Sequence, residues 1–392
     1  METDTNTPPV LVVNAGSSSL KVKLLPQNLS LLVERIGDTP NVRASFTDVP
    51  AEIAADRVTN HETALQVCLD AIAEKHDLSD IRAVGHRVVH GGERYAEPVV
   101  IDDDVIAAID ELSVLAPLHN PPNLEGIRAA QRLLPGIRHV AVFDTGFHAA
   151  LPPKAYLYAI PRRFYEEQGI RRYGFHGPSH DYVTRQAAKT LGRPREELRL
   201  ISLHLGNGAS AAAVSRGRSV YTSMGFTPLA GLVMGTRCGD IGPGVLLHLL
   251  RQGMSVDDLD QMLNKESGLL GLSGVSNDMR DLEKAIAEGN EQAAEALDVF
   301  CFRITQTVGS MAAVMGGLDA VVFTGGIGEH QAQVRADSLA SLDFLGIRID
   351  AAKNEADERD ISTADATVKT LVIPTDEEQM IADATRACLD EV

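Results

Sequence analysis

Two arginines stand in segments where a cation would meet an anionic ligand. Arg87 lies in the strand-like run of residues 83–92, and Arg237 lies between Gly235 and Gly239. An arginine in a buried strand requires an anionic partner, because an unpaired charge is costly to remove from water. Glycines let backbone and ligand approach each other closely. Both arginines are candidate anion binders, with a structural salt bridge as the alternative for Arg87 and a solvent-exposed loop for Arg237.

A carboxylate and two histidines are further candidates for chemistry. Asp144 follows the apolar run of residues 137–143 and so stands at the end of an expected strand. A carboxylate there can bind Mg²⁺, orient a reacting group or cap the next turn. His119 and His176 lie in loop-like segments, and their pattern alone gives neither a catalytic role. No Cys or Ser stands beside a base in a triad-like order, so hydrolase chemistry is disfavoured.

Three loops rich in glycine or hydroxyl residues follow expected strands, at residues 14–19, 204–210 and 324–329. Backbone N–H groups of such turns can bind phosphate oxygens, and Lys21 adds a charge beside the first. That loop is not a Walker A motif, because a strand follows it where the motif requires a helix. The third loop reads GGxG and lacks the GxGxxG dinucleotide pattern. Two facing turns can bracket a triphosphate, an arrangement similar to that of the actin-like ATPases and sugar kinases.

The elements that must position these loops alternate between strands and helices. Residues 10–13 and 20–25 flank the first loop as a hairpin, and residues 198–205 and 211–214 flank the second. Two such hairpins half a chain apart predict a duplicated domain. In open α/β sheets ligands bind beyond the carboxyl ends of strands.

Helices and further strands connect the two hairpins. Thr59 and Glu62 form an expected capping box for an amphipathic helix, and residues 375–378 are expected to cap the final helix. Residues 319–323 and 370–373 are expected strands. Asp144, the Gly325 loop and Glu377 would then all lie at strand ends, where a ligand is expected.

Composition limits the partners of the chain. Its 392 residues exceed what one hydrophobic core usually organises, so two domains are expected. The formal net charge of −18 argues against nucleic acid and an anionic membrane surface as partners. The four cysteines have no metal or redox spacing, and no apolar run reaches the roughly 20 residues that span a bilayer. With no signal-peptide pattern at residues 1–9, the prediction is a soluble, cytoplasmic protein.

Taken together, the motifs resemble those of the acetate kinase family along essentially the whole chain, in the family's order. The matching segments are residues 12–21, 85–93, 117–123, 143–145, 173–177, 204–208, 234–237 and 374–378. The resemblance implies an α/β fold of duplicated actin-like, ribonuclease H-like domains with a ligand cleft between them. The first domain would comprise residues 1–152, completed by the helix of residues 376–392, and the second residues 153–375. It further implies reversible, Mg²⁺-dependent transfer of the ATP γ-phosphoryl group to acetate by a homodimer, with Mn²⁺ as the alternative metal.

The resemblance also assigns roles by matching position. Asn14 and Glu377 would lie near Mg²⁺, Arg87 and Arg237 would bind the carboxylate and the moving phosphoryl group, and His176 would stabilise that group. Asp144 would be the catalytic acid, but an ionised acetate needs no base, so we expect it to orient a metal, its water or an arginine. The pocket for the methyl group would be lined by Val89, Leu118, Phe175 and Pro228. The nucleotide would be held by Lys21, His204, Leu205, Gly206, Asn207, Gly208, Asp278, Met279, Arg280, Gly326, Ile327, Gly328, Glu329 and His330.

Three positions depart from the family pattern. Gly242 replaces a frequent Asp, His330 replaces Asn, and Pro178 replaces Thr or Ser. The first two concern loops near the nucleotide and leave the preferred nucleotide open. A propionate or butyrate kinase is the alternative within the family, and an actin-like, nucleotide-dependent binding protein is the alternative from another class. Only the kinases need Arg87 and Arg237 beside an apolar pocket.

Overall fold

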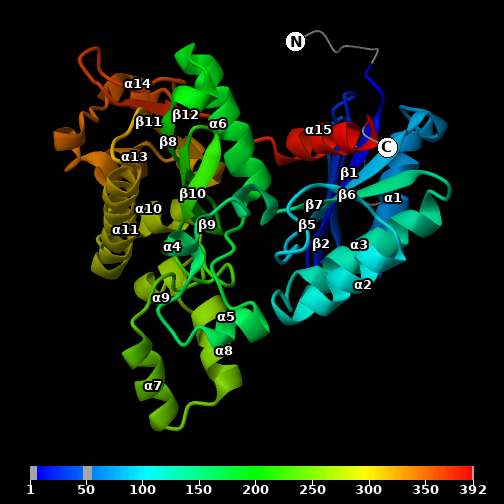
Figure 1. Ribbon diagram of the computed structural model, residues 1–392, viewed down its shortest axis with the longest axis horizontal. Helices are drawn as coiled ribbons and strands as arrows, with labels where there is room; N and C mark the ends of the chain where they lie inside the picture. Colours follow the sequence, from blue (N-terminus) through cyan, green and yellow to red (C-terminus); the bar gives the residue numbers. More distant parts are fainter. Residues whose placement is uncertain (1–6, 47–54, 391–392) are drawn as a thin grey trace. The chain divides into compact units, whose positions relative to one another are not determined.

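The computed structural model describes residues 7–46 and 55–390 (Figure 1). Contacts divide the chain into two compact units, which we call unit 1 and unit 2. Unit 1 comprises Met1–Gly146 and Asp376–Val392, and unit 2 comprises Phe147–Thr375. Each unit is built on one mixed β-sheet. Within the described ranges, no helix combines the length and apolar character needed to cross a membrane.

Unit 1 contains a seven-stranded sheet in the order β4-β3-β2-β1-β5-β7-β6. Its strands are β1 Val10–Ala15, β2 Ser19–Leu25, β3 Leu29–Glu34, β4 Asn41–Ala44, β5 Ala83–Val88, β6 Val99–Val100 and β7 Arg138–Phe143. Its helices are α1 His61–Ala73, α2 Asp103–Glu111, α3 Asn120–Leu133 and α15 Glu377–Asp390, with 3₁₀ turns at Ala55–Arg57, Leu78–Asp80 and Leu112–Val114. The predicted first hairpin is confirmed, since β1 and β2 pair antiparallel around residues 16–18.

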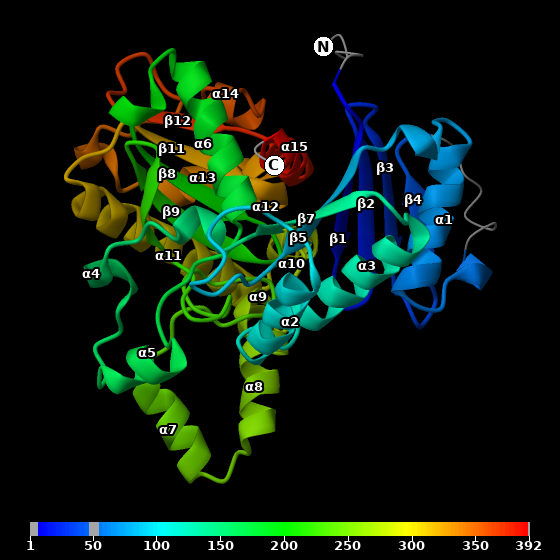
Figure 2. The same ribbon diagram turned by 45° about the vertical axis from the view of Figure 1, so that its right-hand side comes forward.

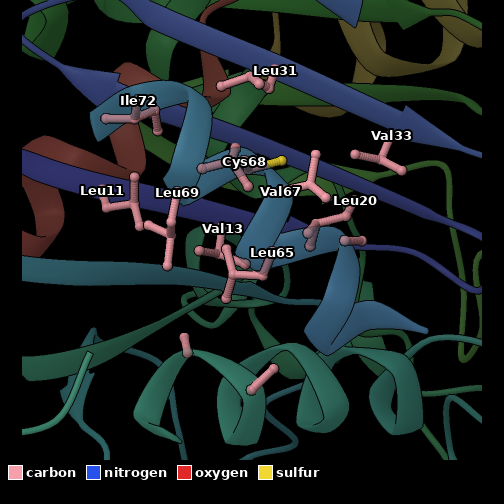
Figure 3. Packing of buried hydrophobic residues seen from close by; sticks show 14 of the residues in the cluster. Leu11, Val13, Leu20, Leu31, Val33, Leu65, Val67, Cys68, Leu69 and Ile72 are labelled. Atoms are coloured by element: carbon pink, nitrogen blue, oxygen red, sulfur yellow. The ribbon is translucent and has the colours of Figure 1, made fainter. Parts of the chain in front are cut away.

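The two faces of this sheet bury different helices. Leu11 and Val13 of β1 pack with α1 and α3 in one apolar cluster, and Figure 3 shows Leu65 and Leu69 of α1 against them. Val10 and Val12, which point to the opposite face by the alternation of a strand, join a second cluster with Ile381 and Ala382 of α15. Gly85 allows α15 to lie close to β5, because a Cβ at that position would clash with Thr385 Oγ1.

Two predicted helix caps are displaced by one residue. The first residue before α1 is Asn60, whose side chain accepts from Thr63 N at 2.9 Å while the Thr63 hydroxyl completes the capping box. Thr59 and Glu62 therefore do not form the box. At α15, Asp376 Oδ1 accepts from Gln379 N at 3.0 Å, so this helix is capped by Asp376 and not by Thr375, the first residue of the predicted capping segment 375–378.

Unit 2 contains a five-stranded sheet in the order β10-β9-β8-β11-β12. Its strands are β8 Arg199–Leu205, β9 Ala209–Ser215, β10 Arg218–Thr222, β11 Ala320–Thr324 and β12 Lys369–Val372. Its helices are α4 Pro153–Tyr156, α5 Arg163–Gln168, α6 Gly177–Leu191, α7 Pro243–Arg251, α8 Val256–Lys265, α9 Gly268–Ser273, α10 Met279–Ala287, α11 Glu291–Met315, α12 Gly325–His330, α13 Ala332–Leu339 and α14 Ala351–Glu355. Short 3₁₀ turns lie at Gly146–His148, Arg195–Glu197 and Asp343–Leu345. Helix α6 packs on the sheet through Val183 and Ala187, and Figure 2 shows its course beside β8 and β11.

The two sheets share one topology. The order β3-β2-β1-β5-β7 in unit 1 corresponds to β10-β9-β8-β11-β12 in unit 2. In both, the first three strands are antiparallel, and the last two run parallel to the strand that precedes them in the order. The predicted α/β class and its duplication are thus confirmed. The loops of residues 14–19 and 204–210 occupy equivalent positions, between the first two strands of each copy.

Candidate functional site

Unit 1 brings Arg87 and Asp144 together at the ends of two neighbouring parallel strands. Arg87 Nε donates to Asp144 Oδ1 at 2.9 Å and Nη2 donates to Oδ2 at 2.7 Å. This two-bond geometry fixes the plane of the guanidinium. The Asp144 side chain is 1% exposed and that of Arg87 is 19% exposed, so one edge of the arginine remains accessible. The Asp144 carboxylate thus holds the Arg87 side chain in one orientation in this structure, and its part in the chemistry stays a prediction.

Further polar groups of unit 1 surround this pair. Arg87 Nη1 lies 3.4 Å from Asn14 Oδ1, and Arg87 Nε lies 3.9 Å from Glu377 Oε2. Burial alone would lower the pKa of Arg87, but the charges of Asp144 and Glu377 raise it above its ordinary value. Burial raises the pKa of Glu377, an effect that Arg87 opposes and Asp144 reinforces. Lys21 Nζ forms an ion pair with Glu378 at 2.5 Å.

The oxygen atoms of this cluster fit a hard divalent cation. Mg²⁺ is usually held by one or two carboxylates, with water and substrate phosphates completing its six ligands. Glu377 supplies a carboxylate and Asn14 a carbonyl oxygen, both against Arg87. Among the residues that the structure describes, no group of three or more His, Cys, Asp or Glu side chains is arranged as a complete metal site. Protein atoms would thus supply only part of the coordination of a magnesium ion.

Unit 2 places His176 at the start of α6, where its backbone adopts a left-handed conformation with φ 57°. Its ring stacks on that of His204 with a centroid separation of 4.3 Å. The side-chain Nδ1 lies 2.9 Å from Ser210 Oγ, which also lies 2.8 Å from His180 Nε2. Burial, and then the neighbouring His148 and His204, lower the pKa of His180 well below its ordinary value. His180 is therefore neutral at pH 7 and anchors Ser210.

Sequence reasoning missed His180, and it named Ser210 only as the end of the loop of residues 204–210. His180 follows His176 by four residues, so it lies one helical turn beyond the residue that precedes α6. That spacing was the available signal, but it required knowing that a helix begins at Gly177. Pro178 fits this start, because the first turn of a helix needs no backbone N–H from its proline.

Arg237 lies in the same unit as His176 and in a different electrostatic setting from Arg87. Its Nη1 donates to the carbonyl oxygen of Pro228 at 2.6 Å. Burial lowers the pKa of Arg237, and no carboxylate within the described ranges forms an ion pair with it. A Cβ added at Gly208 would lie 2.8 Å from Arg237 Nη2 and 3.5 Å from His176 Cε1. Arg237 and His176 therefore meet at the second glycine turn.

We expect Gly208→Ala to lower kcat by about 10- to 100-fold with little loss of stability. The added methyl group would displace the guanidinium of Arg237, and such a displacement reduces the reaction rate more than it disturbs the packing of the fold. Gly206→Ala is the matched control, since its Cβ would meet only Gly208 O at 3.4 Å and His204 Nε2 at 4.0 Å. Steady-state kinetics and thermal unfolding of both variants measure the two effects. Equal kcat values for the two variants would show that the contact at Gly208 does not matter.

Some of the residues expected to hold the nucleotide lie in a helix where the sequence predicted a loop. Residues 325–330 form helix α12 and not the loop that the sequence suggested. Glu329 Oε1 accepts from the N–H groups of Gly325 at 2.9 Å and Thr375 at 3.3 Å, which stabilises the helix start. Glu329 thus faces the backbone, whereas the His330 side chain is 71% exposed.

Other nucleotide candidates of unit 2 lie around Asn207. Its Oδ1 accepts from Asn277 Nδ2 at 3.0 Å, next to Asp278. Side-chain and backbone hydrogen bonds from Arg280 lower the pKa of Asp278 to about 2, and Asp278 caps α10. Asn207 O also accepts from Gly235 N at 3.0 Å. The segments of Asn207, Gly235 and Asp278 are thereby joined.

The four residues expected to line a methyl pocket are divided between the units. Val89 is 8% exposed and Leu118 48% exposed, both in unit 1. Phe175 is 1% exposed and Pro228 is partly buried, both in unit 2. The pocket itself stays a prediction.

Comparison with known proteins gives a consistent result. The model of the Acetokinase family matches residues 9–383. An acetate kinase of Clostridium botulinum (strain Kyoto / Type A2) is 50% identical over 390 residues, covering 96% of this chain and 98% of that protein. An acetate kinase of Natranaerobius thermophilus is 49% identical, covering 97% of this chain and 99% of that protein.

Solved structures agree in fold over the same length. The crystal structure of Porphyromonas gingivalis acetate kinase superposes with a TM-score of 0.89 at 41% identity, covering 98% of this chain and all of that one. A propionate kinase of Francisella tularensis superposes with a TM-score of 0.90 at 39% identity, covering 97% and 100%.

Proposed function

We propose that this chain transfers the phosphoryl group directly from ATP to acetate in one in-line step. The chain belongs to the Acetokinase family and is an acetate kinase. It is a phosphotransferase with a carboxyl group as acceptor. The observation that carries the direct transfer is the setting of Arg237, a partly buried cation beside His176 without a carboxylate partner in the described residues. Such a group is suited to stabilise the negative charge that develops on the phosphoryl group during its transfer.

The chemistry of the acceptor explains why charge matters more than proton transfer. Acetate, with a pKa of about 4, is already ionised at neutral pH, so it needs no general base. It must approach a phosphate of the same sign, and that repulsion is the main obstacle. Arg87 is proposed to bind the carboxylate, with Asp144 holding the guanidinium in place through its two hydrogen bonds. Arg237 and His176 are proposed to bind the phosphoryl oxygens.

The metal and the nucleotide are assigned to the remaining site residues. A bound Mg²⁺, or Mn²⁺ in its place, would neutralise phosphate charge. Asn14 and Glu377 are proposed to hold the metal, and their oxygen atoms beside Arg87 support this. Members of this family use ATP, and we propose that Lys21 and the segments of residues 204–208, 278–280 and 326–330 contact it.

We expect kcat/KM to fall steeply from acetate to propionate and from propionate to butyrate. Each added methylene must fit an apolar pocket proposed to consist of Val89, Leu118, Phe175 and Pro228. One methylene is worth about 10- to 200-fold in discrimination. An assay that couples ADP formation to NADH oxidation, run with ATP, Mg²⁺ and each carboxylate in turn, measures this ratio.

The same assay separates the alternatives. Equal kcat/KM for acetate and butyrate would contradict an acetate pocket, and a maximum at propionate would favour the activity named for the Francisella tularensis relative. A nucleotide-dependent binding protein would bind ATP without any carboxylate-dependent ADP formation.

We also propose a homodimer in the cytoplasm. Helix α7 buries none of its residues in the chain, and Val245, Leu247 and Leu250 are 47%, 51% and 37% exposed, which favours a covering partner copy. All four cysteines are free, as expected in a reducing compartment. Sedimentation velocity should show a dimer that Leu247→Glu weakens, while Val114→Glu, at an apolar residue 84% exposed in unit 1, should not. A monomeric wild-type protein would contradict the dimer.

A further inference from the structure

Helix α3 begins with two buried asparagines whose side chains do not cap it. The segment reads Asn120-Pro121-Pro122-Asn123, and no side-chain hydrogen bond caps the helix start. The two prolines have no N–H group, so the first turn presents fewer donors that need a cap. Asn120 is fully buried and Asn123 is 4% exposed. Buried amides must find hydrogen-bond partners elsewhere, and these two find them in other backbone segments.

The Asn123 carboxamide bridges two segments that carry proposed site residues. Its Oδ1 accepts from Val89 N at 3.0 Å, and its Nδ2 donates to Ala15 O at 2.7 Å. Val89 follows Arg87 by two residues, and Ala15 directly follows Asn14. Both hydrogen bonds are buried, so neither is in competition with solvent.

This bridge stands where the sheet no longer holds the two segments together. The parallel ladder of β1 and β5 runs from Val10 and Ala83 to Val13 and His86, and it ends there. Asn14 and Arg87 are the next residues along each strand. Beyond the end of the ladder, one side-chain amide takes the place of the missing backbone hydrogen bonds.

The glycine turn has a second anchor of the same kind. His61 Nε2 of α1 lies 2.7 Å from Gly16 O, so the carbonyls of Ala15 and Gly16 are both held by side chains from helices. In a trans peptide the N–H points opposite to the C=O, so the N–H of Ser17 points away from His61. Helix α3 also lies directly on the strand end, because a Cβ at Gly126 would meet Ala15 Cβ at 2.7 Å.

We propose that Asn123 is a positioning residue that sets the separation between Asn14 and Arg87. It thereby aligns the turn that is to meet phosphate with the strand that is to meet the carboxylate. The proposal rests on the function proposed above for Asn14 and Arg87. Because His61 still holds the turn, loss of Asn123 should shift Asn14 without releasing the whole loop.

The test compares Asn123→Ala with Asn120→Ala in steady-state kinetics and thermal unfolding. Asn120 bonds to His90 N at 3.1 Å and to the carbonyls of His90 and Ile109 at 3.2 Å, and it does not bridge to Ala15. Both variants should lower the unfolding temperature. Asn123→Ala should also lower kcat by about 10- to 100-fold, as expected for reacting groups displaced by about 1 Å, whereas Asn120→Ala should change kcat by no more than about threefold.

A double-mutant cycle with Asn14→Ala adds a readout that a merely structural role would not move. If Asn123 acts by placing Asn14, its cost in kcat should largely vanish once Asn14 is alanine, whereas independent effects would multiply. Multiplying effects, or equal losses of kcat for Asn120→Ala and Asn123→Ala, would overturn the proposal.

Two further variants keep the test decisive. Asn123→Leu has nearly the same shape but offers neither the acceptor for Val89 N nor the donor for Ala15 O. It should therefore be as slow as Asn123→Ala, and wild-type kcat would refute the bridge even if the alanine variant fails to fold. If Asn14→Ala itself retains full kcat, the function proposed for Asn14 is wrong. The cycle with Arg87→Ala then decides on Asn123 by the same criterion.

Discussion

Arg237→Ala is expected to lower kcat by about 100- to 1,000-fold while changing KM for ATP much less. Removal of one fixed donor that binds charge in the transition state typically costs about 3–4 kcal/mol. The structure adds a reason for a large effect, since no carboxylate in the described residues neutralises this partly buried cation. Its field is therefore available to a ligand. Steady-state kinetics with ATP and acetate varied separately measure both quantities.

Arg237→Lys should recover little of the lost activity. Arg237 Nη1 is already engaged with Pro228 O while Nη2 lies at the Gly208 turn, and one ammonium cannot occupy both places. Guanidine added to Arg237→Ala should restore part of the rate by filling the vacated space. Near wild-type kcat for Arg237→Lys would show that a point charge suffices. A rise only in KM for acetate would make Arg237 a binder of the ground-state carboxylate.

Asp144→Ala should reduce both stability and activity. Breaking a buried ion pair by removing one partner typically costs about 3–5 kcal/mol, because the other charge is left uncompensated. Asp144 is 1% exposed and makes both strong hydrogen bonds to Arg87, so its loss should also let the guanidinium turn away from its bound orientation. We expect a fall in kcat of at least about 100-fold. Urea unfolding and kinetics on the same preparation separate the two losses.

Replacing both partners tells orientation from stability. Arg87→Met with Asp144→Leu removes the pair and leaves apolar side chains in place of both charges, which often restores stability. This double variant should unfold near the wild-type urea midpoint and remain inactive. If it regained activity with its stability, the pair would serve the fold alone.

Much of the fold was predictable from local patterns, because strands and glycine turns are local features. The hairpins around residues 16–18 and 206–208, the strand of Arg87 and the strand before Asp144 are all confirmed. That Arg87 and Asp144 pair was not predictable, since it depends on β5 and β7 being neighbours in the sheet. The sequence showed only that Arg87 lies in a strand-like run and that Asp144 follows another expected strand.

Two misreadings have physical causes. Residues 325–330 contain glycines that disfavour a helix, but Glu329 accepts from the N–H of Gly325 and stabilises the first turn. The caps at Asn60 and Asp376 each have a second capping residue directly before them, so the pattern could not fix the position to one residue. The role of Asn123 in joining two strand ends was invisible because its partners are backbone atoms far away in sequence.

Unit 1 is built from two separate stretches of the chain, and this affects how the protein folds during synthesis. On the ribosome, the strands of residues 10–143 emerge long before α15, whose Ile381 and Ala382 complete the apolar face formed by Val10, Val12, Val140 and Val142. Until then that face lacks its cover, and Arg87 lacks Glu377. Unit 2, continuous from Phe147 to Thr375, can close its core first. The early-synthesised half should therefore be the part of the nascent chain that chaperones bind and that matures last.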